Sequence, residues 1–169
     1  MRSIDEMRAD MLSPDALKRI DRELTKYPAD QKQSAVMSAL AIAQAEKNYL
    51  SDEVVEFVAK YLDMPPVAVW EVATFYTMYN LSPVGKHKLT ICTNLPCALS
   101  GAVDAADHLK KCLKIGFNET TADGQFTLKE GECFGACGDA PVMLHNNHKM
   151  ISFMTPENID KLLAELSTK

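Results

Sequence analysis

The sequence lacks the features that mark several large classes of protein. Within its 169 residues, no apolar run approaches the ~20 residues of a membrane-spanning helix, so we expect no direct membrane insertion. The formal net charge is −5, which gives nucleic-acid binding no electrostatic support. The N-terminus has no apolar signal core, and its acids do not suit a transit peptide. We therefore expect a location in a reducing cytoplasm, or on the cytoplasmic side of a membrane-associated assembly.

Motifs for substrate and nucleotide chemistry are also missing. The sequence contains no P-loop, no G-x-G-x-x-G and no Ser/His/Asp order of a hydrolase. There is thus no sign that the chain itself binds NAD or flavin, and we assign no catalytic residue. The composition, 47% hydrophobic and 24% charged, is ordinary for a globular protein of one or two domains.

Four of the five cysteines form two spaced pairs. The first is Cys92-Thr-Asn-Leu-Pro-Cys97, the second is Cys133-Phe-Gly-Ala-Cys137, and 35 residues separate them. Four converging thiolates can hold zinc, hold an iron–sulfur cluster or form disulfides. In a [2Fe–2S] cluster each iron takes two bridging sulfides and two thiolates, so four cysteines complete the site. Small residues such as Gly135 would let the second loop approach the cluster and donate N–H groups to sulfur.

The alternatives fit the spacing less well. Structural zinc is the strongest rival, but four-cysteine zinc sites usually use C-x2-C pairs, and neither pair here has that spacing. Disulfides suit small secreted chains, whereas this chain has an odd number of cysteines. The spacing favours a cluster, and a zinc-stapled scaffold without redox chemistry stays open as an alternative. Cys112 falls on the apolar stripe of a predicted helix, so we expect a buried small side chain and not a ligand.

The first half of the sequence predicts a small helical bundle. We expect a tail over residues 1–12, a helix begun by the N-cap Ser13, a second over residues 31–47, a third capped by Ser51 and a fourth from about Pro66. The predicted inward face of the second helix consists of Met37, Leu40, Ala41 and Ala45. The predicted apolar stripe of the third helix consists of Val54, Phe57, Val58, Tyr61 and Leu62. The aromatic residues that end this half are expected to be core or interface: Trp70, Phe75, Tyr76, Tyr79.

The second half predicts the order β-α-β-β-β-α, an α/β sandwich of thioredoxin-like type. The expected strands cover residues 87–91, 126–129, 142–144 and 149–153, and the expected helices cover residues 99–113 and the segment after the N-cap Thr155. In the first two strands apolar and polar residues alternate, which places Leu89 and Leu128 inward. Cys97 would lie just before the first of these helices, and Gly116 would cap its end. We expect four exposed histidines: His87, His108, His145, His148. The predicted domains are residues 1–80, a helical bundle, and residues 82–169, the α/β sandwich.

Four stretches of the sequence together resemble one family. They are Ala73-Thr-Phe-Tyr-Thr-Met-Tyr-Asn-Leu81, Pro83-Val-Gly85, Ile91-Cys-Thr-Asn-Leu-Pro-Cys97 and Glu132-Cys-Phe-Gly-Ala-Cys-Gly-Asp-Ala-Pro141. They closely resemble the small [2Fe–2S] subunit of the NADH dehydrogenase module of respiratory complex I, from about residue 14 onward. Related subunits occur in NAD-reducing hydrogenases and NAD-dependent formate dehydrogenases, so either is an alternative parent enzyme.

The resemblance implies a fold, a cofactor and partners. It implies an N-terminal helical bundle that docks a partner and a thioredoxin-like [2Fe–2S] ferredoxin domain. The implied ligands of the cluster are Cys92, Cys97, Cys133 and Cys137. The implied function is electron transfer within NADH:quinone oxidoreductase, beside a partner subunit that binds FMN and NADH and among other subunits of the peripheral arm.

The charge beside the second cysteine loop predicts a redox property. Glu130, Glu132 and Asp139 surround this loop in sequence, with Lys129 as the only nearby base. Adding an electron beside carboxylates is unfavourable, so we expect a cluster at the low-potential end of the iron–sulfur range.

Overall fold

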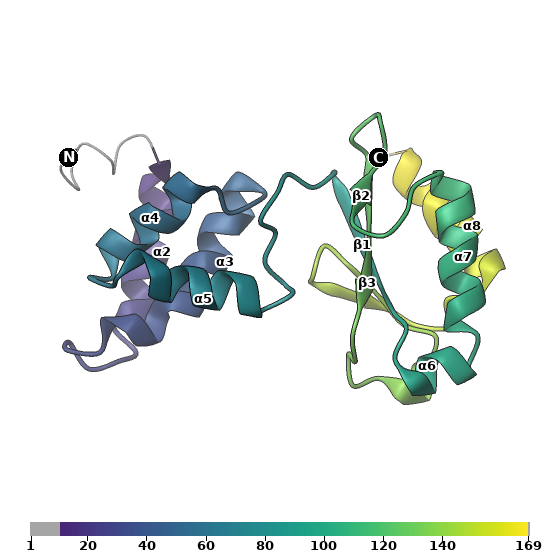
Figure 1. The fold of residues 1–169 in the computed structure, drawn as a ribbon, viewed down its shortest axis with the longest axis horizontal. Helices are drawn as coiled ribbons and strands as arrows, with labels where there is room; N and C mark the ends of the chain where they lie inside the picture. The colour runs from purple at the N-terminus through teal and green to yellow at the C-terminus, as the bar shows by residue number, and fades with distance from the viewer. Residues whose placement is uncertain (1–10, 169) are drawn as a thin grey trace. The chain divides into compact units, whose positions relative to one another are not determined.

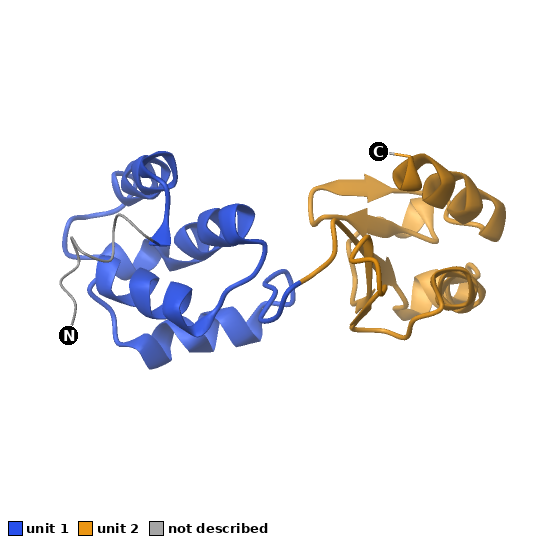
Figure 2. Cartoon of the chain, turned by 90° about the horizontal axis from the view of Figure 1, so that it is seen from above, with its two compact units in different colours: residues 1–83 blue, residues 84–169 orange. Residues whose placement is uncertain are grey.

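The computed structural model describes residues 11–168. The chain divides into two compact units, Met1–Pro83 (unit 1) and Val84–Lys169 (unit 2), shown in separate colours in Figure 2. Most of the tail predicted over residues 1–12 lies outside the described residues. Leu12, however, is only 3% exposed and belongs to the core of unit 1, so the prediction was wrong for this residue.

Unit 1 is helical, as predicted (Figure 1). Its elements are α2 (Pro14–Leu24), the 3-10 helix η1 (Lys32–Ala35), α3 (Val36–Lys47), α4 (Asp52–Tyr61) and α5 (Pro66–Phe75). The side chain of Ser13 accepts a hydrogen bond from the N–H of Ala16, and that of Ser51 accepts one from Val54. Both predicted N-caps are therefore confirmed, and each supplies an acceptor to an otherwise unpaired first-turn donor.

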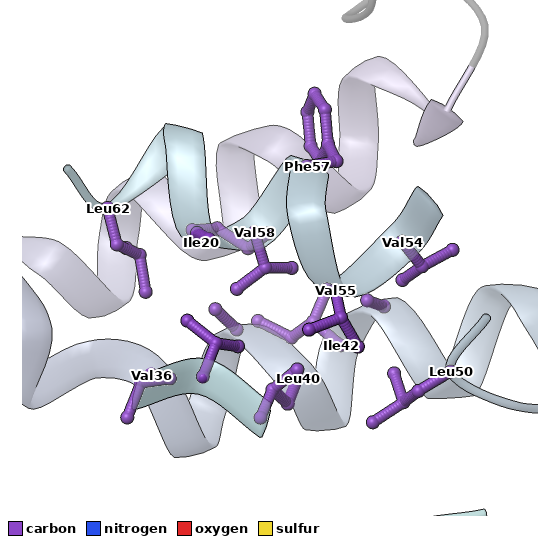
Figure 3. Close-up of a cluster of buried hydrophobic side chains, with 14 of the residues drawn as sticks. Ile20, Val36, Leu40, Ile42, Leu50, Val54, Val55, Phe57, Val58 and Leu62 are labelled. Atoms are coloured by element: carbon purple, nitrogen blue, oxygen red, sulfur yellow. The ribbon is translucent and has the colours of Figure 1, made fainter. Parts of the chain in front are cut away.

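The described core of unit 1 combines apolar residues of α2, α3, α4 and α5, and Figure 3 labels several from the first three of these helices. The predicted stripe of α4 is confirmed, because Val54, Phe57 and Val58 are at most 3% exposed. The predicted face of α3 is wrong except for Leu40. This helix carries two apolar stripes with helical spacing, and the fold buries the stripe formed by Val36, Ala39, Leu40 and Ala43.

The aromatic residues of unit 1 divide into two groups. Tyr79 is buried, and its hydroxyl donates to the carbonyl oxygen of Met37 over 2.8 Å; Trp70 packs against the same core. Phe75 is 77% exposed and Tyr76 is 39% exposed. The prediction of core packing holds for the first two residues, whereas Phe75 and Tyr76 lie on the surface.

Unit 2 is built on a five-stranded sheet with the order β2-β3-β1-β4-β5. The strands are β1 (His87–Cys92), β2 (Glu119–Thr120), β3 (Phe126–Gly131), β4 (Met143–His145) and β5 (Lys149–Ile151). β1 and β3 run parallel, and the remaining neighbours are antiparallel. The thioredoxin-like prediction is confirmed, with one addition: the short strand β2 at the edge was not predicted.

Two helices, α7 (Ala102–Leu113) and α8 (Pro156–Ser167), cover the same face of this sheet (Figure 1). Leu109 of α7 and Ile159 of α8 are fully buried against Leu89, Ile91 and Leu128 of the strands. The predicted alternation of β1 and β3 places these strand residues toward the helices.

The segment before α7 differs from its prediction. The expected single helix over residues 99–113 is broken into the short helix α6 (Leu95–Leu99) and α7, with Gly101 at a φ of +93° between them. Cys97 lies within α6 and not immediately before the long helix α7, as was predicted. Lys114, in left-handed conformation, ends α7 in place of the predicted Gly116.

Two of the histidines are not surface residues. His87 is 7% exposed, and its Nδ1 lies 3.1 Å from Nε2 of the partly buried His145. Burial lowers the pKa of both imidazoles. The prediction of exposure was wrong for this pair because the contact joins β1 to β4, and the two residues are 58 positions apart. His148 is exposed, as predicted, whereas the side chain of His108 is only partly exposed, at 28%.

Among residues 11–168, no helix combines the length and the apolar character needed to cross a lipid bilayer.

Candidate metal centre

The two cysteine loops start at the same edge of the sheet of unit 2. Cys92 is the last residue of β1 and lies opposite Gly131, the last residue of β3, in the parallel register. The N–H of Thr93 donates to the carbonyl of Gly131 over 3.2 Å, and that of Cys92 donates to the carbonyl of Val142 over 3.0 Å. Because parallel strands end at one edge, segments 35 residues apart in sequence leave the sheet side by side.

The first pair of cysteines is buried. Cys92 is 2% exposed and Cys97 is 1% exposed. Burial raises the pKa of the Cys92 thiol, and the neighbouring Cys97 raises it further, whereas N–H donors from Asn94 and Phe134 act in the opposite direction. Phe134 belongs to the second loop, so the two loops already meet at the sulfur of Cys92.

The second pair is exposed. Gly135, between Cys133 and Cys137, has a φ of +74°, which a residue with a side chain rarely adopts. In this conformation its N–H donates to Sγ of Cys133 over 3.3 Å, as the sequence predicted for backbone donors in this loop. Such donors stabilise negative charge on sulfur.

A small apolar cluster joins the two loops. Its buried members are Cys92, Cys97, Ala102 and Val142. Phe134, Ala136 and Ala140 of the second loop pack against it from outside. Four thiols in two pairs, on adjacent loops with N–H donors to sulfur, fit the ligand set of a [2Fe–2S] cluster.

Polar contacts also tie the loops to their surroundings. The hydroxyl of Thr93 donates to Oε1 of Glu130 over 2.7 Å, which links the first loop to the strand before the second. Asp139 accepts hydrogen bonds from the Ser152 hydroxyl over 3.1 Å and, at its carbonyl, from the N–H of Phe153 over 2.9 Å. All three predicted carboxylates, Glu130, Glu132 and Asp139, are exposed.

Cys112 is apart from both loops, and its predicted burial was wrong. The thiol is exposed on α7, where it faces His108 and Asp160. The apolar stripe of α7 ends at Leu109 and the partly buried Leu113, so residue 112 falls on the border of that face. The spacing of His108 and Cys112, four residues on one helix, was the sequence signal for this group.

Comparison with known proteins agrees with the geometry of the loops. The model of the thioredoxin-like [2Fe–2S] ferredoxin family matches residues 20–167, which include all four cysteines of the loops. The chain belongs to this family. Membership indicates a [2Fe–2S] cluster, in agreement with the cofactor predicted from the sequence.

Curated relatives match over most of their length. The chain is 46% identical over 125 residues to an NADH-quinone oxidoreductase subunit of Rickettsia typhi, covering 73% of this chain and 74% of the relative. It is 42% identical over 145 residues to the corresponding protein of Rickettsia felis, covering 85% and 86%. It is 35% identical over 147 residues to an NADH-quinone oxidoreductase subunit of Thermus thermophilus, covering 87% and 81%.

A solved structure supports the fold. In the air-oxidised state of an NAD+-reducing [NiFe]-hydrogenase, one chain matches 82% of this ferredoxin-family chain with a TM-score of 0.69 and 19% identity. The match covers 24% of the hydrogenase chain, so it reports a shared fold within a larger protein.

Proposed function

We propose that this chain is the electron-transfer subunit of an NADH:quinone oxidoreductase, with Cys92, Cys97, Cys133 and Cys137 as the ligands of one [2Fe–2S] cluster. The observation that carries the proposal is the meeting of the two cysteine loops at one sheet edge. The identity to NADH-quinone oxidoreductase subunits over most of the chain supports the parent enzyme. A bound cluster would supply one-electron redox chemistry.

The residues of the chain have distinct tasks in this proposal. Cys92 and Cys97, both buried, keep water from one side of the site, while the exposed Cys133 and Cys137 leave the other side open. The N–H groups of Gly135 and Phe134 point at sulfur and stabilise the negative charge of the site in both redox states. The chain therefore provides position, burial and hydrogen bonds, and the substrate chemistry belongs to its partner.

The partner we propose is the subunit that binds FMN and NADH, within an assembly of other peripheral-arm subunits on the cytoplasmic side of the membrane. Leu95, Leu99 and Val103 lie within and after the first cysteine loop and are 68%, 82% and 52% exposed. Apolar side chains this exposed are typical of interaction surfaces. A partner seated on them would lie beside Cys97, as electron transfer over a short distance requires.

The predicted N-terminal domain, residues 1–80, is proposed as a second docking element. It offers exposed apolar side chains on and after α5, among them Val67, Phe75 and Tyr76. Aromatic residues are favoured in interfaces.

The runner-up function is the equivalent subunit of an NAD-reducing hydrogenase, which has the same fold. Isolation of the native assembly distinguishes the two, because a co-purifying [NiFe] subunit would favour the hydrogenase.

Assays of iron and acid-labile sulfide on the full chain, with EPR after reduction, test the cofactor. We expect two irons and two sulfides per chain, and a colourless zinc protein would contradict the proposal. Replacing any of the four proposed ligands by Ala should remove the visible absorption, because an iron with an open coordination position is exposed to solvent. Cys112→Ala is the matched control and should keep the spectrum.

A further inference from the structure

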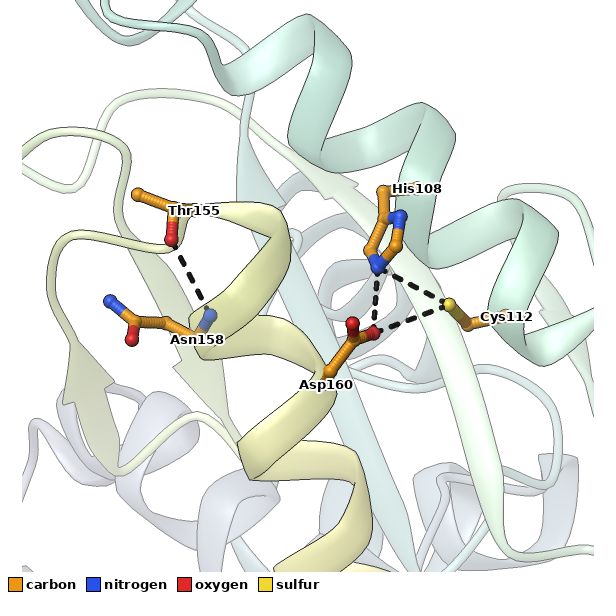
Figure 4. A network of polar contacts seen from close by, with 5 residues as sticks. All are labelled: His108, Cys112, Thr155, Asn158 and Asp160. Carbon is orange, nitrogen blue, oxygen red and sulfur yellow. Dashed lines mark hydrogen bonds and ion pairs between the residues drawn. The ribbon is translucent and has the colours of Figure 1, made fainter.

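A second group of metal-ligating side chains lies on the helical face of unit 2, away from the cysteine loops. His108 and Cys112 are four residues apart on α7, and Asp160 is on the adjacent helix α8 (Figure 4). Nε2 of His108 lies 2.7 Å from Oδ1 of Asp160 and 3.4 Å from Sγ of Cys112, and Sγ lies 3.7 Å from the same Oδ1. Three different donor atoms therefore face one point.

We propose that His108, Cys112 and Asp160 form a binding site for a divalent zinc ion that joins α7 to α8. The distances are close to those of a zinc centre. With bond lengths of about 2.0 Å to N and O and about 2.3 Å to S, tetrahedral ligands lie about 3.3 Å apart for N and O and about 3.5 Å for each pair that includes S. The two sulfur distances thus need changes of about 0.2 Å or less, and the His108–Asp160 distance must widen by about 0.6 Å.

The donor set selects the class of metal. Imidazole, thiolate and carboxylate together suit Zn²⁺, whereas Mg²⁺ and Ca²⁺ prefer oxygen ligands alone. On binding, the Cys112 thiol loses its proton to solvent, and the proton with which Nε2 of His108 contacts Asp160 is given up to solvent while Nδ1 carries the remaining ring proton, so that Nε2 presents a lone pair. Thiolate and carboxylate then balance the charge of the ion, and the fourth position is left for water.

The same geometry argues against a nucleophilic thiol. In a Cys-His-Asp arrangement for catalysis, the imidazole uses one nitrogen toward the nucleophile and the other toward the carboxylate. Here Nε2 faces both Sγ and Oδ1. Partial desolvation of the Cys112 thiol beside α8, together with the neighbouring Asp160, raises its pKa, which favours the protonated thiol when no metal is bound.

A neighbouring carboxylate favours a cation at this site. Glu157, one turn before Asp160 on α8, interacts electrostatically with both His108 and Asp160 and adds negative charge beside the site. Lys110 of α7 is engaged elsewhere: its Nζ lies 3.2 Å from Asp107 and 4.2 Å from the centre of the Phe117 ring.

The test uses the full chain with its cluster loaded, freed of loosely bound metal and dialysed against Zn²⁺. We expect one zinc per chain by elemental analysis, with the visible absorption of the cluster unchanged. X-ray absorption at the zinc edge should show one sulfur at about 2.3 Å together with nitrogen or oxygen at about 2.0 Å. His108→Ala, Cys112→Ser and Asp160→Asn should each weaken binding at least tenfold. The matched control His148→Ala, at an exposed position, should bind as the parent does.

Two results would overturn the proposal. One is zinc binding in Cys112→Ser that equals the parent. The other is a zinc edge showing several sulfurs with loss of the cluster absorption, which would place the ion in the cysteine loops. Circular dichroism of each variant separates loss of a ligand from loss of the fold, and none of the three positions is buried, so substitution there disturbs packing little.

Discussion

Replacing Gly131 by Ala tests how the second cysteine loop is held. A Cβ at this position would overlap the ring of Phe134 and lie 2.9 Å from Cγ2 of Thr90. Nonbonded carbons prefer ~3.5–4.0 Å, so the Thr90 methyl must retreat by at least about 0.6 Å and the ring by more. Since Phe134 follows Cys133 directly, its displacement moves a loop that we propose to hold the cluster.

Two effects of this substitution oppose each other. Overpacking costs about 1–3 kcal/mol. The lower chain entropy of the unfolded Ala variant stabilises the fold by about 0.4–1 kcal/mol, because Gly131 does not have a positive φ. The clash is larger, so we expect a net loss of about 1–2 kcal/mol. For a unit of this size, each kcal/mol of lost stability lowers the melting temperature by about 4–8 °C.

Gly138→Ala is the matched control in the same loop. A Cβ there would have no heavy atom within 4 Å and φ is not positive, so this variant should be neutral or slightly stabilised. Thermal unfolding followed by circular dichroism measures both variants, and the visible absorption reports retention of the cluster. Phe134→Leu should cost less stability in the Gly131→Ala background than in the parent. Equal stability of the two glycine variants, or additive effects of the pair, would refute the steric argument.

Three further outcomes are expected. Deleting residues 1–80 should abolish association with the flavin subunit while residues 82–169 still fold around the cluster; full-strength co-purification of the truncated chain would contradict the docking role. Glu132→Gln and Asp139→Asn should each raise the midpoint potential of the cluster in a redox titration followed by EPR. The expected rise is at most about 90 mV for a carboxylate ~8 Å from the cluster at an effective dielectric of ~20. Unchanged midpoint potentials in both variants would show that these charges do not set the potential. Burial raises the pKa of Tyr79 to about 12, above its unfolded value of about 10, so the free energy of unfolding of the parent should fall between pH 10 and pH 12. Urea unfolding at a series of pH values measures this free energy, and Tyr79→Phe should lose less of it over the same pH range.

Local signals in the sequence predicted local structure well. The N-caps Ser13, Ser51 and Thr155 each accept the expected backbone hydrogen bond, because a cap depends on residues within one turn. The alternation in β1 and β3 likewise identified the buried side chains of Leu89 and Leu128. Both patterns depend only on residues that are close together in the sequence.

The errors arose where a residue's environment depends on distant segments. Two stripes on α3 had helical spacing, and only the packing of other helices selects one of them. The burial of His87 depends on His145, and the exposure of Cys112 depends on the path of α8 beside α7. In the candidate site, the spacing of the cysteines predicted the ligands, whereas the contact of Phe134 with Gly131 depends on the path of the loop across the strand end and was not predicted.

The strand order has a consequence for biosynthesis. β1 lies between β3 and β4, and both neighbours are later in the chain. On the ribosome, therefore, Cys92 and Cys97 emerge while both edges of their strand lack hydrogen-bonded neighbours, and Cys133 and Cys137 follow only later. Native pairing of such distant segments is slow to form. A nascent chain thus exposes two thiols before the second pair exists, so a cluster held by the four proposed ligands can be completed only after Cys137 has been synthesised.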